Sequence, residues 1–182
     1  MTRRTLERVT SPMDGATLAA ALVNTRPRPA SLQDGLPDGA AAARLLATHG
    51  LAASVDEAGA ALPGLLRLRG ELLAAFVAPD MPALAAALNP HLTRTPPERL
   101  VGDGSGWALR APEDGRSLTD RVAALAARGL AEVALAGHDR LGICAADDCQ
   151  AVFADTSPRG ARRYCTRTCA NRVNVRRHRA SV

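Results

Sequence analysis

Residues 141–157 read LGICAADDCQAVFADTS, and residues 162–180 read RRYCTRTCANRVNVRRHRA. These two stretches hold every cysteine of the chain, in the spacing C-x4-C-x15-C-x3-C. The cysteines are Cys144, Cys149, Cys165 and Cys169. Each close pair can supply two ligands from one tight turn, and Zn²⁺ binds four thiolates tetrahedrally. We therefore predict that the four cysteines bind one structural zinc ion.

Two alternatives compete with this interpretation: a pair of disulfides, or four thiols without a ligand. In a reducing compartment, clustered cysteines are more often metal ligands than disulfides. A catalytic zinc is disfavoured, because four cysteine ligands close the coordination sphere, whereas a hydrolytic zinc keeps one position open for water. His178 could replace a cysteine, but it lies nine positions beyond Cys169 and four thiolates already suffice.

The residues around the cysteines predict a treble-clef-like zinc finger. Short apolar segments flank the turn CAADDC, which indicates a knuckle between two short strands, and the chain becomes compatible with a helix from Cys169 onward. This module has too few apolar side chains for an independent core, so we expect zinc to supply much of its folding free energy. Asp147 and Asp148, inside the knuckle, are interpreted as exposed turn acids.

Arginines surround the cysteine pairs. Residues 156–182 hold 8 Arg and no acid, whereas residues 1–155 hold 15 Arg and 18 acids. In a helical projection, Arg172, Arg176 and Arg179 lie within one arc. Because a rigid basic surface attracts phosphates, we predict nucleic-acid contacts from the following residues: Arg162, Arg163, Arg167, Arg172, Arg176, Arg177 and Arg179. The alternative is a solvated basic face. For Asn171 we expect structural support of the knuckle, since it follows a ligand by two positions.

The remainder of the chain predicts a mainly α-helical body, residues 1–138, followed by the zinc finger, residues 139–182. Aromatic residues make up 2% of the chain and Ala, Leu and Val dominate its apolar residues, which is typical of packed helices. Asp38, Ser54, Asp80 and Ser117 are candidate N-caps of four helices, and a further short helix covers 15–23. Residues 99–111 predict a β-hairpin around a Gly-rich turn.

Composition also excludes several classes of function. The chain has no Lys, so it cannot form a phosphate-binding loop that ends in Gly-Lys-Ser/Thr or a Schiff base. It shows no arrangement of a nucleophile and a base, and we expect no enzymatic activity. No stretch approaches the roughly 20 apolar residues that span a bilayer, so we expect a cytoplasmic protein that does not bind membranes.

The C-terminal residues resemble the CGNR zinc-finger family, named for a Cys-Gly-Asn-Arg motif at the last ligand. Here the motif reads Cys169-Ala170-Asn171-Arg172, with Ala in place of Gly. Near the N-terminus, Leu22-Val23-Asn24-Thr25 resembles the opening segment of the ABATE domain that accompanies this finger. In that family an Asp commonly precedes the segment, where this chain has Ala21.

The resemblance implies a bacterial transcription regulator that responds to stress, with the finger on duplex DNA. It also implies that the larger domain senses a small-molecule effector or forms a homodimer. A second hypothesis treats the finger as an RNA-binding or protein-interaction module, because treble clefs serve all three kinds of partner. Binding to RNA or protein that survives high salt, without binding to DNA, would favour that hypothesis.

Overall fold

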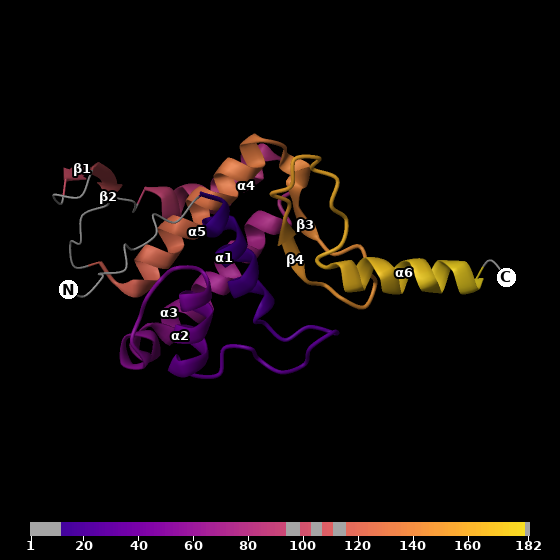
Figure 1. Ribbon diagram of the computed structural model, residues 1–182, viewed down its shortest axis with the longest axis horizontal. Coiled ribbons are helices and arrows are strands. Elements are labelled where there is room, and N and C mark those ends of the chain that lie inside the picture. Colours follow the sequence, from indigo (N-terminus) through magenta and orange to yellow (C-terminus); the bar gives the residue numbers. More distant parts are fainter. Residues whose placement is uncertain (1–11, 94–98, 103–106, 111–115, 181–182) are drawn as a thin grey trace.

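The computed structural model describes residues 12–93, 99–102, 107–110 and 116–180 (Figure 1). Five α-helices precede the first cysteine in this described part, as the sequence predicts. They are α1 (Pro12–Asn24), α2 (Gly39–Thr48), α3 (Val55–Phe76), α4 (Met81–Leu92) and α5 (Leu118–Leu135). None of the described helices combines the length and the apolar character that crossing a membrane requires.

The four predicted N-caps are confirmed. The side chains of Asp38, Ser54, Asp80 and Ser117 each accept a hydrogen bond from the backbone N–H three residues later. Each bond satisfies one of the N–H groups that the first turn of a helix leaves unpaired. Four helices therefore begin where the sequence predicts, and each start is fixed by the hydrogen bond of its N-cap.

Two prolines lie inside helices, although proline ordinarily interrupts or ends a helix. α3 is continuous across Pro63, and α4 continues past Pro90 to Leu92. Buried side chains explain both cases: Ala58 and Leu65 flank Pro63, and His91 directly follows Pro90. Packing of these side chains in the interior holds each helix together where proline removes one backbone hydrogen bond.

The core of the body lies between α1, α3 and α5. Apolar side chains at helical spacing on α3 and α5 supply much of it. The buried ones are Leu65, Leu68, Leu72 and Phe76 of α3, and Leu118, Val122, Leu130 and Val133 of α5. Gly15 of α1 faces the backbone of Leu125, where a Cβ atom would collide with the Leu125 carbonyl oxygen. Glycine at this position therefore allows α1 and α5 to pack backbone against backbone.

The predicted β-hairpin is also confirmed. β1 (Arg99–Gly102) pairs antiparallel with β2 (Trp107–Arg110), and Gly102 lies opposite Trp107. The turn that joins these strands lies outside the described residues. The hairpin lies at the end of the molecule opposite the C-terminal helix (Figure 1).

The C-terminal part begins with the short helix η1 (His138–Arg140), followed by β3 (Leu141–Ile143), β4 (Val152–Ala154) and α6 (Arg167–Ala180). β3 and β4 pair antiparallel around the first cysteine knuckle. Strand, knuckle, strand and helix follow one another as the treble-clef prediction requires. Leu141, Val152 and Ala154 are buried in the same core as the helical body, so this hairpin packs against the body directly.

Candidate metal centre and nucleic-acid interface

The first cysteine pair is held by the β3–β4 hairpin. The Cys144 N–H donates to the Ala151 carbonyl at 2.7 Å, and the Cys149 N–H donates to the Ala146 carbonyl at 2.9 Å. Gln150 closes the turn with a φ of 53°, a left-handed conformation that is uncommon outside glycine. These contacts direct both side chains of the pair to the same side of the hairpin.

The second pair lies at the start of α6. Cys165 precedes the helix, and Cys169 lies in its first turn. Thr166 is the N-cap, because its hydroxyl accepts a hydrogen bond from the Cys169 N–H at 3.2 Å. Ala170, the departure from the family motif, lies in ordinary helical conformation inside α6, so glycine's conformational freedom is not needed there.

The four cysteine sulfurs lie within 4.8 Å of one another. The separations between Sγ atoms are 3.5 Å for Cys149 and Cys165, 3.6 Å for Cys165 and Cys169, and 3.7 Å for Cys149 and Cys169. A tetrahedral zinc with Zn–S bonds of about 2.3 Å needs sulfur separations of about 3.8 Å. All four are free cysteines, and these separations are far longer than a disulfide bond. The cluster therefore has the donor set and the dimensions of a four-thiolate metal site.

Burial affects the protonation of this cluster. It raises the pKa of the Cys149 and Cys165 thiols above the usual value for cysteine. Metal ligands must be thiolates, so a cation that binds here displaces protons from these two residues.

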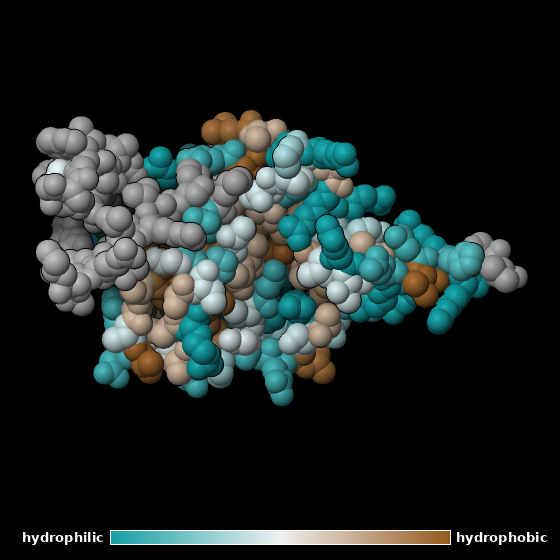
Figure 2. Space-filling model, viewed as in Figure 1, coloured by the Kyte–Doolittle hydropathy of each residue, from teal (hydrophilic) through white to brown (hydrophobic). Residues whose placement is uncertain are grey.

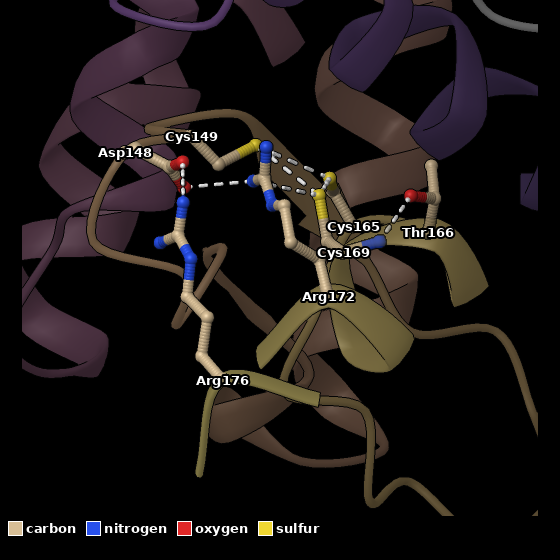
Figure 3. Close-up of polar contacts among 7 residues, drawn as sticks. All are labelled: Asp148, Cys149, Cys165, Thr166, Cys169, Arg172 and Arg176. Carbon is tan, nitrogen blue, oxygen red and sulfur yellow. Dashed lines mark hydrogen bonds and ion pairs between the residues drawn. The ribbon is translucent and has the colours of Figure 1, made fainter. Parts of the chain in front are cut away.

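Arg172 and Arg176 reach back from α6 to the knuckle (Figure 3). Nη2 of Arg172 donates to Asp148 Oδ1 at 2.7 Å and lies 3.7 Å from the Cys169 sulfur, and Nη2 of Arg176 donates to Asp148 Oδ2 at 3.0 Å. These ion pairs lower the pKa of Asp148 although partial burial opposes them. Asp148 is therefore a turn acid, with a side chain 38% exposed, that also ties α6 to the knuckle, a role that the sequence did not indicate.

Arg162 is also part of the local framework. Its guanidinium donates to the Tyr164 carbonyl at 2.9 Å and to the Cys165 carbonyl, and it lies 5.4 Å from the centre of the Phe153 ring. Arg162, Arg172 and Arg176, all predicted to contact nucleic acid, thus have partners within the protein. Arg162 and Arg172 lie next to ligand cysteines, and Arg176 lies one helical turn beyond Arg172.

The remaining predicted contacts are exposed, as Arg162 and Arg176 also are. They are Arg163, Arg167, Arg177 and Arg179. Asn171 is exposed as well, and its side chain makes no hydrogen bond with any residue in the described ranges. The structure therefore gives no contact for the predicted supporting role of Asn171.

Sequence reasoning missed the residues that join the finger to the body. The side chain of Asn24, at the end of α1, donates to the Val152 carbonyl at 2.9 Å and accepts from the Val152 N–H at 2.8 Å. Arg26 donates to the Gln150 carbonyl at 2.6 Å. The resemblance of Leu22-Val23-Asn24-Thr25 to the opening segment of the ABATE domain was the available signal, but it does not indicate which residues the segment contacts.

Two further residues that the sequence did not single out support the loop before Tyr164. Arg140 donates to the Ser157 carbonyl at 2.7 Å, and Asp155, which is 2% exposed, accepts the N–H groups of Ser157 and Arg162. Burial alone would raise the pKa of Asp155, but these hydrogen bonds outweigh it and the pKa is lowered. The loop is therefore fixed at both of its ends.

Comparison with known families agrees with this geometry. Residues 16–137 match the model for ABATE, described as "Putative stress-induced transcription regulator". The chain belongs to the ABATE family. Its residues 140–181 match the CGNR zinc finger model, which spans the cysteine cluster, so the resemblance seen in the sequence is confirmed for both parts. No curated protein matches the chain.

Proposed function

We propose that this ABATE protein is a regulator of transcription that binds duplex DNA through a zinc-stabilised finger. The observation that supports the proposal best is a basic groove beside the cysteine cluster, at the start of α6. The groove has a volume of about 590 Å³ and is bordered by Arg159, Arg163 and Arg167. All three side chains are exposed and none has an ion-pair partner among the residues that the structure describes.

The groove has the chemistry of a phosphate site. The first N–H groups of α6 carry partial positive charge and add to the three guanidinium groups. Asp155 is the one acid at its border, and its carboxylate is occupied by backbone N–H donors. A backbone phosphate placed here would therefore meet donors and little repulsion.

The helix α6 supplies a second contact surface. It extends away from the body (Figure 1), and residues 174–179 are exposed on every side. Its visible face is mostly hydrophilic, with one hydrophobic patch (Figure 2). A major groove about 12 Å wide admits an α-helix, and Arg176, Arg177 and Arg179 would then lie near phosphates.

In this proposal the arginines have different roles. Arg162 and Arg172 hold the shape of the finger, and Arg176 both ties α6 to the knuckle through Asp148 and contacts DNA. The remaining exposed arginines of the finger contact DNA. One zinc ion, bound by the four thiolates, fixes the turn from which α6 begins. Because four thiolates leave no open position, the ion takes no part in a reaction, and we propose no enzymatic activity for the body. Residues 1–138 would form the regulatory part and residues 139–182 the DNA-binding part.

The test is fluorescence anisotropy of a labelled duplex with the zinc-loaded full chain, at several salt concentrations. With about five phosphate contacts, log K should fall with log[salt] at a slope of about −4.5. Replacing Arg163 and Arg167 together by Gln should reduce the slope by about 2 units, because two contacts are lost. Arg44→Gln, an exposed arginine on α2, is the matched control and should leave the slope unchanged.

A second pair of variants tests the role of the metal. Cys165→Ser should abolish zinc and DNA binding together, while Arg176→Ala should weaken DNA binding and leave the zinc content at wild-type level. The proposal fails if the zinc-loaded protein binds no duplex at low salt. It also fails if folded RNA binds and survives a salt concentration at which DNA does not bind, which would support the RNA-binding alternative.

A further inference from the structure

A second cavity lies at the junction between the body and the finger. It has a volume of about 360 Å³, at the lower end of the range for small-molecule sites. Thr17, Ala20 and Asn24 of α1 border one side, and Arg28 and Ala30 of the following loop continue it. The finger closes the opposite side, so the body and the finger both contribute to the wall.

Outside the cysteine cluster, the charged side chains of this wall are all basic. Arg28, Arg162 and Arg172 border the cavity, and neither Asp nor Glu does so among the described residues. Cys149, Cys165 and Cys169 also border it, so metal-bound thiolates offset part of the positive charge. Arg28 uses Nε to bond the Asn24 carbonyl at 3.3 Å, and no described residue accepts from its two terminal nitrogens. Arg162 and Arg172 bond their partners through Nε or Nη2, so the Nη1 group of each has no acceptor in the described part of the chain.

Another guanidinium group lies near Arg28. Burial together with the charges of Arg28 and Arg69 lowers the pKa of Arg26. Crowded guanidinium groups of this kind favour a negatively charged ligand.

The rest of the wall is apolar. Ala20, Ala151, Val152 and Phe153 border the cavity, and the guanidinium of Arg162 lies over the Phe153 ring. An inorganic ion would leave these side chains facing water, whereas an apolar group would cover them. We propose that the junction cavity binds a small oxyanion, a carboxylate or a phosphate ester, that carries an apolar group.

The position of the cavity suggests how such a ligand acts. Arg162 and Thr166 border both this cavity and the basic groove at the start of α6. A ligand that holds Arg162 and Arg28 together would fix the finger against the body and shift the residues of the groove. This regulatory consequence rests on the DNA-binding proposal above, while ligand binding itself does not.

The binding test is isothermal titration calorimetry on the zinc-loaded full chain, with phenyl phosphate, benzoate and inorganic phosphate as separate probes. Phenyl phosphate or benzoate should bind with a Kd of about 1 mM or lower, the affinity that roughly ten heavy atoms reach in an ordinary pocket. Inorganic phosphate should bind about tenfold more weakly, because it covers no apolar surface. Comparison of the first two probes shows which oxyanion the cavity prefers.

Three variants locate the binding. Arg28→Gln should lower the affinity for the preferred probe by about tenfold, because charged hydrogen bonds to the oxyanion are lost. Ala30→Glu, an exposed loop substitution that places a carboxylate at the cavity, should abolish binding and leave thermal stability unchanged. Arg44→Gln should bind as the wild type does.

Two outcomes overturn the proposal: no probe binds the wild type, or Arg28→Gln and Ala30→Glu both bind with wild-type affinity. If inorganic phosphate bound as tightly as phenyl phosphate, the proposal that the ligand carries an apolar group would be wrong. The Arg163→Gln, Arg167→Gln double variant separates this proposal from DNA binding. It should lose affinity for the duplex and keep affinity for the probe, so each proposal can fail without the other.

Discussion

At the scale of single residues, Asn24 joins the helical body to the finger. It ends α1, and its amide pairs with both the N–H and the carbonyl of Val152, which is 1% exposed. Asn24→Ala would leave two polar groups of a buried strand without partners. We expect the free energy of unfolding to fall by about 1–3 kcal/mol, measured by urea denaturation.

Two further variants make the Asn24 prediction specific. Asn24→Asp keeps an acceptor for the Val152 N–H but places a carboxylate oxygen next to the Val152 carbonyl oxygen. Because these two acceptors repel each other, the variant should be at least as destabilising as Asn24→Ala. Asn174→Ala, on the exposed part of α6, should change stability little. Equal stability of Asn24→Ala and the wild type would contradict the role of this contact.

Another residue-scale prediction concerns Asp34 and Arg69. Arg69 donates to both carboxylate oxygens of Asp34, at 2.7 and 3.0 Å, and these hydrogen bonds lower the pKa of Asp34. The stabilisation is therefore complete above the unfolded pKa, about 3.9, and is lost as pH falls through the lower folded value. The difference in Tm between the wild type and Asp34→Asn should be largest above about pH 4 and should shrink as pH falls below it.

A double variant checks the cause of that pH dependence. In an Arg69→Gln background, Asp34→Asn should produce a Tm difference that changes much less with pH in this range. The remaining change comes from the Leu36 N–H, which also donates to Asp34 and lowers its pKa. A pH dependence as large as in the presence of Arg69 would contradict the assignment to Arg69.

At the scale of elements, α6 depends on its first turn. Residues 174–179 are exposed, so few tertiary contacts support the distal half of the helix. Thr166→Ala removes the N-cap and the hydrogen bond to the Cys169 N–H. We expect it to lower stability by about 1 kcal/mol and to weaken metal binding, since Cys169 then loses its fixed orientation.

Thr168→Ala is the matched control for Thr166→Ala, because Thr168 lies in the same helical turn, is exposed and caps nothing. Urea denaturation and competition for zinc with a colorimetric chelator would measure both effects. If Thr166→Ala and Thr168→Ala behaved alike, the N-cap would have no role in holding Cys169.

The elements were largely predictable from the sequence, and the reasons are local. Asp38, Ser54, Asp80 and Ser117 cap helices through contacts only three residues long, so a short window contains the whole signal. Pro63 and Pro90 were harder to place, because the burial that holds their helices together comes from distant elements.

At the scale of the whole molecule, the body and the finger share one core. Leu141, Val152 and Ala154 pack with the helices of the body, and β3 and β4 also hold the first cysteine pair. Removal of zinc by a chelator should therefore destabilise the helical body as well as the finger. We expect the Tm of the helical circular dichroism signal to fall by about 4–8 °C, equivalent to about 2 kcal/mol in a chain of this size.

The control for zinc removal is chelator added to Cys165→Ser, whose Tm should already be low and should not fall further. A helical transition that keeps its Tm while zinc leaves the wild type would contradict the coupling between finger and body.

The site was only partly predictable, and distance along the chain explains the difference. The spacing of the cysteines indicated the cluster, since each pair forms within one turn. The partners of Arg172 and Asn24 lie 24 and 128 positions away along the chain, and no local sequence pattern indicates such contacts. Arginines beside ligand cysteines were thus predicted as DNA contacts, although two of them hold the finger together.

The pairing of Asn24 with Val152 also bears on how this family can be recombined. The two family matches meet near residue 138, which suggests a natural place to exchange fingers between relatives. A graft made there would take Asn24 from one protein and the strand β4 from another, so the hydrogen bonds between them could be lost. The shared core would also consist of residues from two different proteins. A working chimera would have to exchange the end of α1 and the β3–β4 hairpin together, as a matched pair.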